Sequence, residues 1–245
     1  MNMFNEQNVS VGYRDPAETA TMTRTFMSKV FSWMFLALAI TAVTAFVFAA
    51  TPSLMQMLIK PEGGLSILGW VVMLAPLGFV LLMSFGYQKL SAPLMTLLFM
   101  VYSVLMGMSF SFIFLAYSLG TIGITFAITA GMFGVMALAG YFTKTDLTKF
   151  GSILMMGVIG IVIAMIVNFF LKSDMMGYII SIIGVLIFTG LTAYDVQKLK
   201  RIGSGMSIDS ENTAVRKMAI MGALTLYLDF INLFLFLLRL LGDRR

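Results

Sequence analysis

Two aspartates stand inside segments that are otherwise apolar enough to cross a membrane. Asp195 lies in FTGLTAYDVQKLKR, at the end of a long apolar run, and Asp229 lies in GALTLYLDFINLFLFLLRLL. Counted at about 1.5 Å per residue, Asp229 lies roughly 16 Å into its segment, near the centre of a bilayer. A central aspartate costs about 2.5–3.5 kcal/mol on insertion scales, so it is retained where it is paired, protonated or hydrated. Both aspartates are therefore candidate functional residues.

Small polar side chains accompany each aspartate at helical spacing. Thr225, Asp229 and Asn232 stand at i, i+4 and i+7, and Thr192 and Asp195 stand at i and i+3, so each set shares one helical face. If the two faces meet, the carboxyl groups share a site. Two adjacent carboxylates cannot both ionise cheaply, so we expect the pair to hold one proton and to titrate as a unit. Such a pair could also coordinate a hard cation such as calcium.

Each of these polar residues also has a purely structural interpretation. Asp195 stands three residues before Lys198, so it could lie at the membrane interface, paired with a lysine and shallower than its proposed partner. Asp229 could be a neutral acid that is hydrogen-bonded within the bundle. For Asn168 a hydrogen bond that joins two helices is the simpler interpretation. We retain Asn168 and Tyr194 as supporting polar residues of the predicted site.

Composition places the chain in a bilayer and excludes several kinds of chemistry. It is 60% hydrophobic and 11% charged, whereas soluble domains are about 45–50% apolar and about 25% charged. It contains no cysteine and no histidine, which excludes disulfides, thiolate nucleophiles, histidine bases and zinc sites of the usual kind. Proton chemistry near neutral pH must therefore come from a carboxyl group. We expect no cofactor and no nucleic-acid partner; the expected contacts are lipid, calcium, protons and potentially other membrane proteins.

The apolar segments predict an all-α integral membrane protein with seven transmembrane helices. A helix needs about 20 apolar residues to cross a hydrocarbon core of about 30 Å. Residues 1–25 form a predicted cytoplasmic polar tail, residues 26–245 a single membrane domain, and RIGSGMSIDSEN a flexible loop before the last span. The predicted spans are 30–50, 66–85, 93–117, 120–142, 151–171, 177–194 and 218–238.

The distribution of lysine and arginine predicts a cytoplasmic N-terminus. In that orientation 11 of the 16 basic residues lie inside, and the outer loops hold Lys60 and Lys172. The remaining three, Arg239, Arg244 and Arg245, follow the seventh span and oppose the rule. Either the bias of the other loops dominates or the last segment re-enters, and we favour seven spans. No cleavable signal peptide is predicted, and the expected location is a bacterial inner membrane.

Four stretches resemble the Bax inhibitor-1 family over nearly the whole chain. TFMSKVFSWMFLALAITAVTAF resembles the family's first span, YFTKTDLTKFGSILMMGVIGIVIAMIVNFFL its fourth-to-fifth junction, and FTGLTAYDVQKLK and ALTLYLDFINLFLFLLRLLG its last two spans. The resemblance implies seven helices with the last in the middle of the other six. It also implies a pH-sensitive calcium leak whose paired-aspartate sensor matches Asp195 and Asp229. Some members pair one acid with a basic residue in span two, but SILGWVVMLAPLGFVLLMSF carries no charge here.

Other functions use the same acids or the same surfaces. A proton-coupled calcium exchanger would need the same two aspartates, and a non-transporting regulator would bind other membrane proteins or a quality-control protease. An intramembrane aspartyl protease would fit Tyr194-Asp195, but its second motif needs glycine where Leu226 and Leu228 stand. We therefore expect no enzyme. A retinal protein is excluded because the last span has no lysine for a Schiff base.

Overall fold

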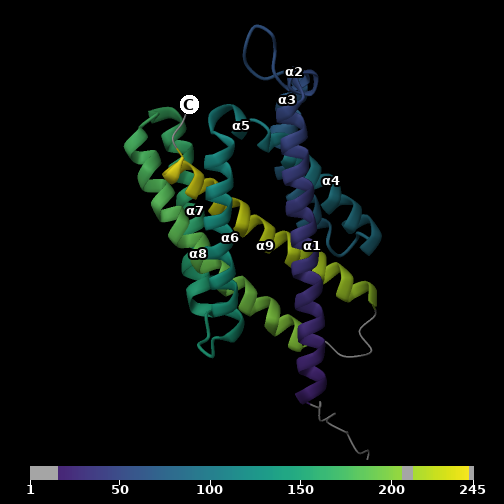
Figure 1. Ribbon diagram of the computed structural model, residues 1–245. Coiled ribbons are helices and arrows are strands. Elements are labelled where there is room, and N and C mark those ends of the chain that lie inside the picture. Colours follow the sequence, from purple (N-terminus) through teal and green to yellow (C-terminus); the bar gives the residue numbers. More distant parts are fainter. Residues whose placement is uncertain (1–15, 206–211, 243–245) are drawn as a thin grey trace, which may run out of the picture.

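The computed structural model describes residues 16–205 and 212–242, which form a bundle of α-helices (Figure 1). Seven helical segments in this part are long and apolar enough to cross a membrane, which confirms the predicted number of spans. The helices of the described part are α1 Pro16–Ala50, α2 Pro52–Leu58, α3 Ile67–Gly86, α4 Ala92–Phe110, α5 Ile113–Ala116, α6 Leu119–Phe142, α7 Thr148–Leu171, α8 Asp174–Ser204 and α9 Asn212–Leu241. Helices α4 and α5 together make the third span.

Serine residues fix where four of the long helices begin. Ser66, Ser91, Ser118 and Ser173 precede α3, α4, α6 and α8, and each hydroxyl accepts a hydrogen bond from the backbone N–H three residues later. This bond satisfies one of the N–H groups that a helix leaves unpaired in its first turn. Local sequence therefore sets these boundaries, although the spans were predicted from apolar length alone.

Three helices extend well beyond the predicted spans, and one of them, α9, begins at Asn212 and ends at Leu241 against the predicted 218–238. Helix α8 continues ten residues past the predicted end at 194, through VQKLKR to Ser204, and α1 already begins at Pro16, inside the expected polar tail. Hydropathy ends a span at the first charged residues, but glutamine, lysine, leucine and arginine are good helix formers, so the helix continues into water. The rest of the predicted tail, 1–15, and the centre of the predicted loop, 206–211, lie outside the described residues.

Helix α9 is the most buried of the seven spans. Seventy-two per cent of its most apolar window is buried, against 6–39% for the other six. It packs extensively against α1, α4, α6 and α8, while α3 packs on α4 and α7 on α8. The expectation that the last helix lies in the middle of the other six is thus not confirmed in full: four helices surround α9, and extensive packing with α3 or α7 is not found among the described residues.

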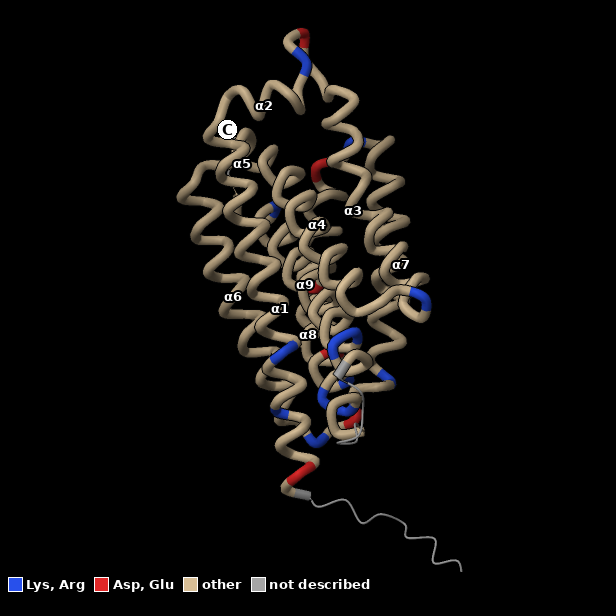
Figure 2. The backbone as a smooth tube through the Cα atoms, turned by 90° about the vertical axis from the view of Figure 1, so that its right-hand side faces the viewer, with Lys and Arg blue, Asp and Glu red and all other residues tan. Residues whose placement is uncertain are grey.

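The outer surface of the bundle is apolar and its charges gather at one end. Helix α7 has only 6% of its window buried, and large side chains such as Phe169 and Phe170 are more than 70% exposed, which suits contact with lipid. Lysines and arginines cluster where α1 begins, α8 ends and α9 begins (Figure 2). We call this the basic end of the bundle.

Candidate functional site

Helices α8 and α9 run antiparallel and meet closely at two glycines. A Cβ atom at Gly222 of α9 would come within 2.7 Å of the Leu199 side chain, and one at Gly184 of α8 within 2.6 Å of Phe236. On α9, Gly222 and Phe236 lie seven residues before and seven residues after Asp229. On α8, Leu199 and Gly184 lie on either side of Asp195. This register brings the middle of α9 to the level of Asp195.

Asp195 and Asp229 meet at this level, inside the bundle. Their side chains are 8% and 4% exposed, and the two carboxyl groups lie close enough to interact directly. A carboxylate only accepts hydrogen bonds, so a hydrogen bond between the two groups requires a proton on one of them. The second oxygen of Asp229, Oδ2, is buried and has no hydrogen-bond partner among the described residues. The extension of α8 to Ser204 removes the apparent difference in depth between the two acids.

The alternative in which Asp195 is an interfacial residue paired with lysine stays open as an electrostatic interaction, without an ion pair among the described residues. Lys198 acts on Asp195 electrostatically, but its side chain is exposed, whereas Asp195 is buried. Within residues 16–205 and 212–242, an ion pair joins Arg201 to Asp146 and none involves Asp195. The nearest acidic partner of Asp195 is therefore Asp229.

The predicted supporting residues on the same faces bond to their own helices. The Thr192 hydroxyl donates to Phe188 O at 2.8 Å and is fully buried. On α9, the Thr225 hydroxyl donates to Met221 O at 3.1 Å, and the Asn232 amide donates to Leu228 O at 2.8 Å. Both threonine hydroxyl hydrogens and one of the two Asn232 amide hydrogens are thus used locally, and the predicted support of the acid pair by these residues stays a prediction.

Tyr194 and Asn168 lie away from the carboxyl pair. The ring of Tyr194 covers Gly151 of α7, so this side chain faces α7. Asn168 lies near the end of α7, where its Oδ1 accepts a hydrogen bond from the Ser173 N–H at 3.1 Å and joins α7 to α8. Asp195 is 21 residues along α8 from Asp174, roughly 30 Å at the helical rise. The structure thus supports the simpler interpretation of Asn168.

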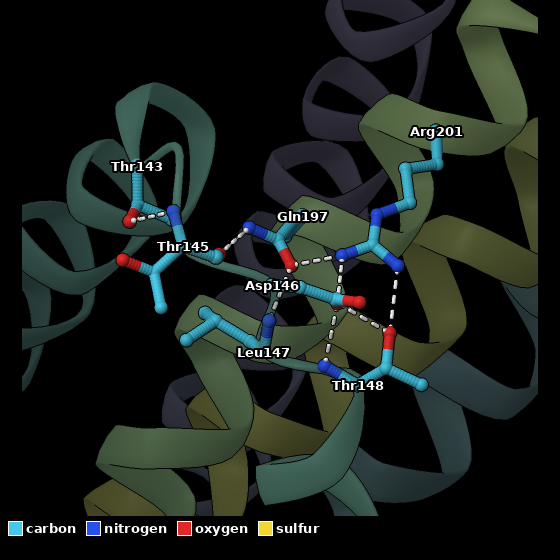
Figure 3. Close-up of polar contacts among 7 residues, drawn as sticks. All are labelled: Thr143, Thr145, Asp146, Leu147, Thr148, Gln197 and Arg201. Carbon is cyan, nitrogen blue, oxygen red and sulfur yellow. Dashed lines mark hydrogen bonds and ion pairs between the residues drawn. The ribbon is translucent and has the colours of Figure 1, made fainter.

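A second polar cluster, which the sequence did not single out, lies at the basic end. Asp146 accepts hydrogen bonds from the Thr148 N–H at 2.9 Å and from the Thr148 hydroxyl at 2.6 Å, and it forms an ion pair with Arg201 (Figure 3). Gln197 donates to Thr145 O at 2.8 Å. The Thr148 hydrogen bonds, and then Arg201, hold the pKa of the Asp146 carboxyl well below its usual range.

This cluster, which we call the clasp, fastens the α6–α7 loop to α8. Its members are Asp146, Thr148, Gln197 and Arg201, and two of them follow Asp195 within two turns of the same helix. One local pattern could have pointed to part of this cluster: Asp146-x-Thr148 precedes a span, and such a pattern is typical of helix starts. The pairing with Arg201 joins positions 55 residues apart, so no local pattern could have predicted it.

Metal-ligand chemistry at the acid pair is limited to two carboxyl groups. No group of three or more aspartate, glutamate, histidine or cysteine side chains that could hold a metal is found in the described part of the chain. Two carboxylates offer four oxygen atoms, whereas calcium takes six to eight oxygen ligands. A cation at this position would need backbone carbonyls or water to complete its coordination.

Residues 23–245 match the family model described as inhibitor of apoptosis-promoting Bax1. The chain belongs to the Bax inhibitor-1 family. Among its relatives in this family, the inner membrane protein YbhL of Escherichia coli K12 is 48% identical over 223 residues, covering 91% of this chain and 93% of that protein. An uncharacterized protein of Borreliella burgdorferi is 44% identical over 220 residues, covering 90% and 92%. With seven spans of its own, this Bax inhibitor-1 family member is a multi-pass protein of the cell membrane.

Proposed function

We propose that this protein forms a pH-sensitive leak path for calcium or other cations across the membrane, with Asp195 and Asp229 as its proton sensor. The observation that carries the proposal is the contact of two buried carboxyl groups between α8 and α9, inside a membrane bundle. Ionisable groups at such a depth are costly, and they typically mark ion or proton pathways. Membership of the Bax inhibitor-1 family agrees with this proposal.

One shared proton holds the two carboxyl groups together. Loss of that proton leaves two like charges in contact in a low-dielectric interior, where their repulsion is far stronger than in water. The separation of the two groups, and of the helices that carry them, then depends on protonation. Because α9 is packed on four neighbours, a shift of α9 against α8 would be transmitted to α1, α4 and α6.

The carboxyl pair is better suited to the transient binding of a passing cation than to tight binding. Separated and ionised, Asp195 and Asp229 could attract a divalent cation, with water completing the coordination sphere. Helix α3, the second span, carries no charge, so no basic residue of that span can pair with the ionised aspartates. We assign no catalytic role to the pair, and we propose that it works without a cofactor.

Calcium flux into proteoliposomes across a pH series tests the proposal. Asp229→Asn and Asp195→Asn keep the shape and hydrogen-bonding capacity of the side chain but cannot ionise. Wild-type flux should change with pH, and the ratio of fluxes at the two ends of the series should fall close to one in either variant. Asp174→Asn, the same change at the exposed start of α8, should retain the wild-type pH response.

Two results would contradict the proposal. A full pH response in both pair variants would place the sensor elsewhere, and absence of flux above empty liposomes at every pH would remove the leak. Proton counterflow separates leak from exchange. A passive leak moves calcium down its gradient without obligatory proton movement, whereas an exchanger must release protons from the liposome as calcium enters, and a pH-sensitive dye inside the liposomes reports this.

A further inference from the structure

A groove runs along the bundle between α1 and α6. Helix α1 packs extensively against α4, α8 and α9, and α6 against α8 and α9, but within residues 16–205 and 212–242 no such packing joins α1 to α6. Figure 1 shows α9 crossing between them. Two hollows lie there, and they share Tyr141 and Phe142 of α6 as a common wall. We call the two together the α1–α6 groove.

The inner hollow is apolar and has a volume of about 420 Å³. Helix α1 lines it with Phe31 and Phe35, α6 with Phe133 and Gly134, and α9 contributes Phe230. All of these are aromatic or small side chains, and the hollow opens sideways toward the membrane. Such a surface fits a hydrocarbon chain.

The outer hollow lies at the basic end, has a volume of about 500 Å³ and is lined by two cations. Arg24 of α1 and Lys200 of α8 face it, together with the polar Thr21 of α1. The Lys200 ammonium donates to Tyr141 O at 2.7 Å, which leaves two of its three N–H groups for a ligand. In the described part of the chain no acidic side chain forms an ion pair with Arg24 or Lys200.

The two hollows together have the length of one leaflet of a bilayer. Thr21 and Phe35 are 14 residues apart on α1, which is about 21 Å at 1.5 Å per residue. A bilayer with its head groups is about 40–45 Å thick, so one leaflet is about 20–22 Å. Arg24 is 11 residues from Phe35 on α1, about 16 Å at the same rise, and half of a hydrocarbon core of about 30 Å is about 15 Å. The cation therefore lies at the level of a lipid phosphate when an acyl chain fills the apolar hollow.

We propose that the α1–α6 groove binds one anionic phospholipid. Its phosphate lies between Arg24 and Lys200, and an acyl chain runs against the phenylalanines of the inner hollow. Anionic lipids attract basic residues at the membrane surface by about 1 kcal/mol per residue, which favours such a lipid over a zwitterionic one. This site is separate from the Asp195–Asp229 pair, and the proposal stands whether or not the protein conducts cations.

Native mass spectrometry of the purified protein, titrated with phosphatidylglycerol or phosphatidylcholine of the same acyl chains, tests the charged half of the groove. Wild type should bind phosphatidylglycerol more tightly. Arg24→Gln should weaken that binding about fivefold, the factor that corresponds to about 1 kcal/mol, and should weaken phosphatidylcholine binding less, because the choline cation offsets the charge of its phosphate. Lys29→Gln is the matched control, because Lys29 is an exposed cation of the same helix that lines neither hollow.

A glycine in the inner hollow tests the apolar half. A Cβ atom at Gly134 would meet nothing within 4 Å, so a leucine side chain can leave the helix there and extend into the hollow. This variant should lose binding of both lipids. Gly131 also has open space around it but does not line the hollow, so Gly131→Leu should bind as wild type does. If a leucine variant folds poorly, Arg24→Gln still tests the proposal, provided that its thermal unfolding temperature equals that of the wild type.

Four results would overturn the proposal. The first is equal binding of both lipids with no effect of Arg24→Gln, and the second is undiminished binding to a folded Gly134→Leu. The third and fourth concern other occupants. Displacement of phosphatidylglycerol by millimolar inorganic phosphate would indicate a simple anion site. Binding that appears only after removal of residues 1–15 would indicate that the chain's own segment occupies the groove.

Discussion

At the scale of single residues, two carboxyl groups in this protein have opposite environments. Asp229 is buried against Asp195 with one oxygen unpartnered, whereas Asp146 is exposed and accepts hydrogen bonds from Thr148 and Arg201. The first arrangement makes a charge costly and the second stabilises it. Only the buried arrangement offers a proton switch, which is why the proposed sensor is the α8–α9 pair and not the clasp.

Titration of Asp146 should show how strongly the clasp holds its charge. Its pKa is lower in the folded protein than in the unfolded chain, so the clasp contributes to stability above about pH 3.9, the ordinary value for aspartate. That contribution is lost as the pH falls from there through the lower folded-state value. Carbon-13 NMR of labelled aspartate should therefore find Asp146 ionised at a pH at which ordinary aspartates are half protonated.

Substitution of either donor should raise the pKa of Asp146 toward its ordinary value. Thr148→Val removes the hydroxyl hydrogen bond, which is the largest single cause of the lowered pKa, and Arg201→Gln removes a hydrogen bond and a favourable charge. Thr145→Val is the control, because Thr145 joins the cluster through its backbone carbonyl. An unshifted Asp146 in wild type would show that the clasp does not form in the membrane.

At the scale of helices, glycines set how closely the helices approach. A Cβ atom at Gly140 of α6 would overlap the backbone carbonyl of Ala193 on α8, two residues before Asp195. A backbone obstacle cannot rotate away as a side chain can, so this glycine fixes the distance between the helices. Small residues let membrane helices pack where no hydrophobic effect drives them together.

Gly140→Ala should therefore destabilise the bundle, because α6 and α8 must move apart. Overpacking of this kind costs about 1–3 kcal/mol in the free energy of unfolding, measured here by denaturant unfolding in micelles. Gly131→Ala, on the same helix but in open space, should be neutral or stabilising by up to about 1 kcal/mol, since alanine favours a helix. Equal stability of the two variants would mean that α6 and α8 do not make this contact.

At the scale of the whole molecule, seven spans place the two ends of the chain on opposite sides of the membrane. The basic end then gathers most of the lysines and arginines, while Lys60, Lys172 and Arg239 lie toward the other end. The positive-inside rule predicts that the basic end is cytoplasmic. In that predicted orientation the α1–α6 groove lies in the cytoplasmic leaflet.

Cysteine labelling should establish this orientation directly. The chain has no cysteine, so single substitutions report one position each. A membrane-impermeant maleimide should label Glu62→Cys in intact spheroplasts and should label Lys149→Cys only after lysis; both side chains are exposed. Labelling in the reverse order would place the basic end outside and would contradict the cytoplasmic-leaflet position of the groove.

The sequence alone determined the number of spans, most of their boundaries and the presence of two acids within the membrane. These properties are local: a run of apolar residues, a serine cap or a buried aspartate is read from neighbours in the chain. The predicted spans missed the start of α1 and the end of α8, because both helices continue beyond the apolar residues that defined the spans.

Only the tertiary structure decided which polar residues meet. It brought Asp195 to Asp229, turned Tyr194 toward α7, placed Asn168 at the other end of α8 and joined Asp146 to Arg201. It also left α1 and α6 apart, and so formed the groove. Each of these results depends on the register and spacing of helices that are distant in the chain. That register is set by side chains that touch across helices, such as Gly222 with Leu199 and Gly184 with Phe236.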